Sequence, residues 1–132
     1  MAGPLPALAH HGTTVTYDST KTIHLTGTVT EWSFIFPHPA IYFDVTNAGG
    51  TVEHWGAETG ANPAVYLRNN GITRNTIKPG DKLELTCHPH RDPNAKVCLV
   101  MQAVVNGKVV NGIGFNVPPP KPVVSSIPPP AP

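Results

Sequence analysis

Histidine is the residue type in this sequence that most clearly suggests chemistry, with seven histidines among 132 residues. Imidazole is the commonest side-chain ligand for metal ions in proteins, and its charge changes near neutral pH. Two groups of histidines are placed where a metal ion could be bound. One is His10-His11 near the N-terminus, and the other consists of His38, His88 and His90, which fall in or beside two expected loops.

The second group could form a Zn or Cu site that keeps one coordination position open. His38 lies between two prolines, and His88 and His90 are two residues apart, so in an extended chain both would point the same way. If the two loops border one face of a small barrel, three imidazoles would converge there. The alternative is that each imidazole only hydrogen bonds to a loop carbonyl.

The first group depends on removal of a signal peptide. The segment Leu5 to Ala9 resembles the end of a secretory signal, because Ala7 and Ala9 occupy the small-residue positions of an A-x-A cleavage site. Cleavage there would give His10 a free amine, and this amine and the imidazole could chelate Cu(II). A solvated terminus and an accidental resemblance are the alternatives. We expect export to the periplasm or the extracellular space.

Cys87 and Cys98 are the only cysteines, and they flank a segment rich in turn-forming residues. In an oxidising compartment they would form one disulfide that joins the strands on either side of this segment. Two buried thiols are the alternative.

Aromatic residues suggest a second type of binding site. Four of them lie on or next to expected strands and could form a surface for a flat apolar ligand or a sugar: Trp32, Phe34, Tyr42 and Trp55. Aromatic side chains of a small barrel can equally belong to the core.

The sequence contains no complete catalytic motif. It has no Gly-x-Ser-x-Gly segment and no phosphate-binding loop, and no spacing singles out Asp44, Glu53 or Glu58 as a catalytic carboxylate. We therefore favour a binding protein over an enzyme.

The elements that would position these residues are mainly strands. Alternation of apolar and polar residues predicts strands over 23–30, 41–45, 51–58, 82–88 and 97–105. The alternation changes phase at Glu31, which predicts a bulge there. Asn106-Gly107 predicts a hairpin that adds a further strand.

A short helix is expected between the third and fourth strands. Asn62 suits its N-cap, Pro63 its first position, and Gly71 the residue after its end. Three strands, a helix and two strands is the order of a five-stranded OB-like barrel, so we predict a mainly all-β protein of that type. We assign residues 1–12 to a signal-peptide remnant and N-terminal arm, 13–117 to the barrel, and 118–132 to a proline-rich tail.

Charge limits the range of partners. The formal net charge is +1, and the nine Lys and Arg residues are spread singly along the chain. Nucleic-acid binding draws most of its affinity from clustered basic residues, so we do not expect it here. No stretch is apolar for long enough to span a membrane as a helix.

The tail after Val117 favours the polyproline II conformation, because it contains Pro118-Pro119-Pro120 and Pro128-Pro129-Pro130. Such a segment cannot form its own core. It could mediate a contact between copies of the chain, which is an alternative function of a structural kind.

The order and spacing of several segments resemble a family of small secreted bacterial proteins grouped only as a domain of unknown function. The matching segments are Ala9-His10-His11, Leu25-Thr26-Gly27-Thr28-Val29, Pro37-His38, Ile41-Tyr42-Phe43, Trp55 to Glu58, Pro63 to Gly71 and Lys78 to Asp81. Family members usually have Asn before the Pro-His pair, where this chain has Phe36. The resemblance implies export and a small β-barrel, and it implies no activity.

The first hypothesis is therefore an exported binding module that binds Cu or Zn through the loop or N-terminal histidines. Self-assembly through the proline-rich tail and binding of a small apolar or sugar ligand on an aromatic face are the alternatives.

Overall fold

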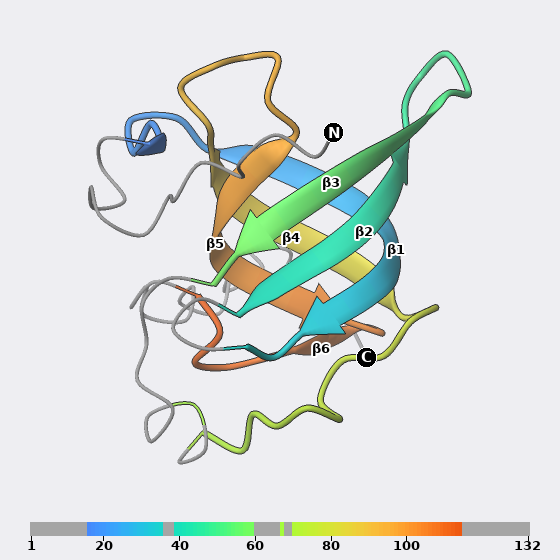
Figure 1. The fold of residues 1–132 in the computed structure, drawn as a ribbon, viewed down its shortest axis with the longest axis vertical. Helices are drawn as coiled ribbons and strands as arrows, with labels where there is room; N and C mark the ends of the chain where they lie inside the picture. The colour runs from blue at the N-terminus through green and yellow to red at the C-terminus, as the bar shows by residue number, and fades with distance from the viewer. Residues whose placement is uncertain (1–15, 36–38, 60–66, 68–69, 115–132) are drawn as a thin grey trace, which may run out of the picture.

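The computed structural model of the chain describes residues 16–35, 39–59, 67 and 70–114. It contains six strands: β1 (Ile23–Ser33), β2 (Ala40–Thr46), β3 (Val52–Glu58), β4 (Lys82–Pro89), β5 (Val97–Val105) and β6 (Lys108–Val109). The first five form a closed ring in the order β1-β2-β3-β5-β4, and β6 lies outside it (Figure 1). All neighbouring strands are antiparallel except β3 and β5. The predicted all-β, five-stranded barrel with an added strand is confirmed.

β1 is long enough to pair with two neighbouring strands. Its first half, Ile23 to Thr28, pairs with β4, and its second half pairs with β2. The register with β2 shifts between Val29 and Glu31, which confirms the bulge predicted from the change of alternation. A Cβ at Gly27 would overlap with the carbonyl oxygen of Asp44. Glycine at this position therefore lets β1 approach β2 closely enough to curve the barrel.

The core lies inside the ring and is built from alternate residues of each strand. On β2, Ile41 and Phe43 are buried, whereas Tyr42 between them is exposed. The other fully buried strand residues of the core are Val29, Ala57, Leu83, Leu85, Cys87, Cys98, Val100 and Ala103. Because successive side chains of a strand point to opposite faces, the residues between them lie on the outer face of the barrel, where Leu99 of β5 is nevertheless buried.

The hairpin after β5 has the predicted turn. Asn106 and Gly107 both have positive φ angles, 50° and 82°, as a two-residue type I′ turn requires. The turn brings Lys108 opposite Val105 and Val109 opposite Val104.

The segment between β3 and β4 contributes buried side chains to the same core. Residues 60–66 and 68–69, which carry most of the predicted helix, lie outside the described residues. The amide of Ile72 donates a hydrogen bond to the carbonyl oxygen of Leu67 (2.9 Å), and Gly71 has a φ of 74°. This is the arrangement in which a glycine ends a helix, so the predicted helix end at Gly71 agrees with the described residues. None of the helical residues described forms a segment long and apolar enough to cross a membrane.

Candidate functional site

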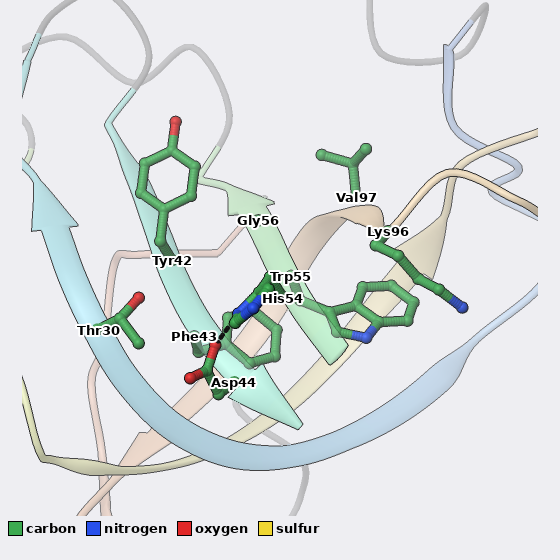
Figure 2. Close-up of a pocket in the computed structure, with 9 residues that line it drawn as sticks. All are labelled: Thr30, Tyr42, Phe43, Asp44, His54, Trp55, Gly56, Lys96 and Val97. Carbon is green, nitrogen blue, oxygen red and sulfur yellow. Dashed lines mark hydrogen bonds and ion pairs between the residues drawn. The ribbon is translucent and has the colours of Figure 1, made fainter. Parts of the chain in front are cut away.

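A groove on the outer surface of the barrel is the candidate site. It has a volume of about 570 Å³ and crosses β2 and β3 between the middle of β1 and the start of β5. We call it the outer groove, and its lining residues are Thr30, Tyr42, Phe43, Asp44, His54, Trp55, Gly56, Lys96 and Val97. Figure 2 shows Tyr42 and Thr30 on one side of the groove and Trp55, Lys96 and Val97 on the other. Most of the exposed lining is carbon, with a few polar groups between apolar side chains.

Tyr42 is the exposed aromatic side chain of the groove, with 44% of its surface accessible. Its cross-strand partner is Gly56 on β3. A Cβ at Gly56 would lie 3.3 Å from the Tyr42 ring and 3.7 Å from the side chain of Val97. Glycine therefore lets the Tyr42 ring and the Val97 side chain lie close to the β3 backbone, with only a narrow slot, about as wide as a methyl group, between them. An aromatic ring beside such a slot is suited to contact the flat face of a ligand.

Asp44 and His54 form a polar pair in the middle of the groove. They are directly opposite each other on β2 and β3, and His54 Nδ1 lies 2.5 Å from Asp44 Oδ1. A carboxylate can only accept, so Nδ1 carries the proton and donates it. In the neutral imidazole, Nε2 is then an acceptor, on a side chain that is 84% exposed. The pair thus offers acceptors from both of its members to a ligand in the groove.

Trp55 and Lys96 form the end of the groove nearest to β5. β3 pairs with β5 only from Gly56 to Glu58, so Trp55 lies where the ring of strands is open on that side. Lys96 Nζ lies 5.4 Å from the centre of the indole ring, as in a cation–π contact. The same ammonium group lies 2.8 Å from Glu53 Oε2. Its hydrogen bond and its charge hold the pKa of Glu53 below the usual value.

The polar groups at the groove are therefore paired with each other. Glu53 forms an ion pair with Lys96, and Asp44 accepts a hydrogen bond from the imidazole of His54. An uncharged ligand would gain apolar contact with Tyr42 and Val97 without separating either pair. Pockets that are mostly apolar with a few placed polar groups are typical of small-molecule sites.

The structure separates the four aromatic residues that were predicted to share a surface. Tyr42 and Trp55 line the outer groove. Trp32 is buried in the core, and its Nε1 donates a hydrogen bond to the carbonyl oxygen of Thr73 (3.0 Å). Phe34 packs against Trp32, with 5.6 Å between the ring centres. Of the four, Trp32 and Phe34 thus pack together away from the groove.

The two described histidines of the predicted metal site are held by backbone groups. His88 lies on β4, and its Nδ1 donates to the carbonyl oxygen of Lys21 (2.8 Å). His90 Nδ1 accepts a hydrogen bond from the amide of Asp92 (2.9 Å), and its ring packs edge-on against Tyr17. In neutral His90 the proton is therefore on Nε2. Metal binding through Nε2 would require loss of this proton, and metal binding through Nδ1 would require loss of the hydrogen bond from the Asp92 amide.

The metal site itself stays a prediction. His10, His11 and His38 lie outside the described residues. Within the part of the chain that the structure describes, no three His, Cys, Asp or Glu side chains are grouped so that they could hold a metal ion.

Cys87 and Cys98 are free thiols in the structure, and both are fully buried. They lie on neighbouring strands and interact with each other. A hydrogen bond between the two side chains and the burial of Cys98 raise the pKa of the Cys98 thiol, so this thiol stays protonated. The predicted disulfide is therefore not formed in the structure, although the two cysteines adjoin, and it stays a prediction.

Several residues of the outer groove were not predicted as site residues. These are Thr30, Asp44, His54, Gly56, Lys96 and Val97. The alternation of β2 does place Tyr42 and Asp44 on one face. The register that sets His54 opposite Asp44 and Gly56 opposite Tyr42 depends on the length of the hairpin, and the β3–β5 contact depends on closure of the barrel.

Comparison with known proteins gives a family and no activity. A family model described as a family of unknown function (DUF6152) matches residues 1–99. This range includes every residue that lines the outer groove and excludes β6 and the proline-rich tail. No curated protein matches the chain.

One similar solved structure is the crystal structure of the ZRD-deleted mutant of TiaS in complex with agmatine. It is 14% identical, with a TM-score of 0.40, and the match covers 70% of this chain. The chain spans only 22% of the length of that protein.

Proposed function

The chain belongs to the DUF6152 family, and we propose that it is an exported, non-catalytic binding module that holds a sugar ring in the outer groove. The observation that supports this proposal best is the exposed Tyr42 ring beside the slot above Gly56, with the Asp44–His54 pair next to it. Aromatic rings bind the apolar face of a sugar, and carboxylate and imidazole groups bind its hydroxyl groups.

Paired charges favour a neutral sugar over an ionic ligand. Lys96 is engaged by Glu53 and by the ring of Trp55, so neither the ammonium nor the carboxylate is free to recognise a strongly charged ligand. The hydroxyl groups of a sugar both donate and accept hydrogen bonds. They can therefore use Asp44 and His54 without breaking the bond between them.

The groove also lies where a barrel of this type commonly binds ligands. The outer face of the second and third strands binds oligosaccharides and oligonucleotides in other OB-like barrels. The basic residues of this chain are few and scattered, which favours the saccharide class.

The experiment is a calorimetric screen of the full chain against neutral, amino and acidic hexasaccharides. Binding should be weakened about tenfold or more by Tyr42→Ala, the loss of about 1.4 kcal/mol expected for one stacked ring. Tyr42→Phe keeps the ring and should retain most of the affinity. Val109→Ala is the matched control, because it truncates an exposed apolar side chain outside the groove. Equal affinity in the original chain and in Tyr42→Ala would exclude this groove as the saccharide site.

A further inference from the structure

We infer that the proline-rich tail, residues 118–132, is an internal ligand of the outer groove and competes with any external ligand for it. The inference rests on the same groove as the proposed function. It concerns a segment that the family match does not include, so the competition would be a property of this chain.

The chain leaves the described structure close to the groove. After β6, the amide of Val110 donates a hydrogen bond to the carbonyl oxygen of Ala103 on β5 (2.9 Å). Gly114 then lies against the Met101–Gln102 peptide, because a Cβ at Gly114 would overlap with the Met101 carbonyl oxygen. The chain thus follows β5 from its end back toward its start, where β5 pairs with β3.

The tail is long enough to reach the groove within one molecule. Met101 and Val97 are four residues apart on β5, a separation of roughly 13 Å at the rise of a strand. The 18 residues after Gly114 would span about 55 Å as polyproline II. The tail could therefore approach the groove and extend across it without stretching.

The chemistry of the groove suits proline rings. Polyproline II segments dock in grooves lined by aromatic side chains, at a low entropic cost because their conformation is already restricted. Tyr42 and Val97 flank the slot above Gly56, and Trp55 lies further toward β5. Each of the two Pro-Pro-Pro clusters of the tail would offer apolar rings of restricted conformation to the Tyr42 and Val97 side chains of the groove.

Hydrogen bonding and charge are also compatible. Carbonyl groups of a polyproline II segment have no internal partner, and the Tyr42 hydroxyl and the Lys96 ammonium are donors at the groove. Lys121 is the only charged side chain among residues 118–132. A nearly neutral segment would enter this groove without separating the Glu53–Lys96 pair.

The test compares the full chain with a full-length variant in which all six prolines of the two clusters, 118–120 and 128–130, are replaced by serine. Ser125→Ala with Ser126→Ala is the matched control in the same tail. The measurement is the amide NMR spectrum of dilute protein, with Gly56 and Val97 as reporters. We expect both amide signals to move in the proline variant and to stay in place in the control.

A second measurement separates this inference from the proposed function. If the tail occupies the groove, the proline variant should bind a hexasaccharide about threefold or more tightly than the original chain, because an intramolecular competitor has been weakened. Moved Gly56 and Val97 signals without saccharide binding would support the tail contact and overturn only the sugar proposal. Saccharide binding of equal strength in both chains, with unmoved signals, would overturn the tail contact and leave the sugar proposal intact. Signals that move only on raising the protein concentration would assign the groove to the tail of a second copy and overturn the intramolecular contact.

Discussion

β2 and β3 carry two neighbouring residue pairs that face opposite sides of the same sheet. Phe43 and Trp55 face each other on the inner side, with nearly stacked rings 6.5 Å apart, and Phe43 is only 1% exposed. One residue further along, Asp44 and His54 face each other on the outer side and are hydrogen bonded. The difference shows how one register serves two purposes. The inner pair packs in or against the core, although both of its rings also reach the lining of the outer groove, and the outer pair lies in the middle of that groove.

Among the residues of the two pairs, Phe43 should cause the largest loss of stability when its side chain is truncated. Phe43→Ala should lower the free energy of unfolding by about 3–5 kcal/mol, because it leaves a cavity in the core. Urea denaturation followed by circular dichroism measures this change. A loss below about 1 kcal/mol would contradict the role assigned to the inner side.

Gly27 tests how closely β1 must approach β2. Gly27→Ala places a methyl group against the backbone of Asp44 and should cost roughly 1–3 kcal/mol of stability. The same denaturation experiment applies, with Gly49→Ala as the control, since Gly49 has a negative φ and its Cβ would meet only the Asn47 side chain at 3.4 Å. If the two substitutions have equal effects, the close approach of β1 to β2 does not limit stability.

Tyr42 tests the outer side of the sheet, where the side chain should matter for saccharide binding and little for stability. Tyr42→Ala should change the free energy of unfolding by no more than about 0.5 kcal/mol, since Tyr42 lies on the outer surface of the barrel with 44% of its surface accessible. It should nevertheless weaken saccharide binding, as described above. Stability and affinity measured on the same protein preparation separate the two roles, and a large loss of stability would place Tyr42 with the core residues.

The smallest effect concerns the ion pair at the end of the groove. Lys96→Met should raise the pKa of Glu53 toward its ordinary value, because the hydrogen bond and charge of Lys96 lower it. Since the pKa is lower in the folded than in the unfolded chain, the ion pair stabilises the fold at neutral pH. This contribution is lost as the pH falls from the unfolded pKa through the folded one. NMR titration of the carboxyl carbon measures the shift, Lys108→Met is the control, and an unchanged Glu53 pKa would contradict the assignment.

Local patterns were sufficient to predict the strands. The alternation in β2 placed Ile41 and Phe43 inside and Tyr42 and Asp44 outside, and the change of phase at Glu31 marked the bulge. Asn106-Gly107 predicted its hairpin because a type I′ turn requires two residues that tolerate positive φ angles. These features depend on neighbouring residues, and a sequence displays them directly.

The site could be predicted only in part, because it depends on contacts between distant residues. Tyr42 and Trp55 both line the outer groove, whereas Trp32, which was expected on the same surface, is buried beyond the bulge, where its Nε1 donates to the carbonyl oxygen of Thr73. No local pattern singles out His54, because its contact with Asp44 depends on the cross-strand register of β2 and β3. The high count of histidines predicts a metal site that includes His88 and His90, and this stays a prediction: the Nδ1 atoms of both are engaged by the backbone, and His88 keeps Nε2 for a ligand.

The most direct test of the outer groove as the ligand site is an amide NMR titration of the full chain with the hexasaccharides of the calorimetric screen. The account predicts signal changes confined to the neighbourhood of Tyr42, His54, Gly56 and Val97, with no change at the far end of β4 around His88 and His90. No signal change with any hexasaccharide at millimolar concentration, or changes centred on His88 and His90, would contradict it.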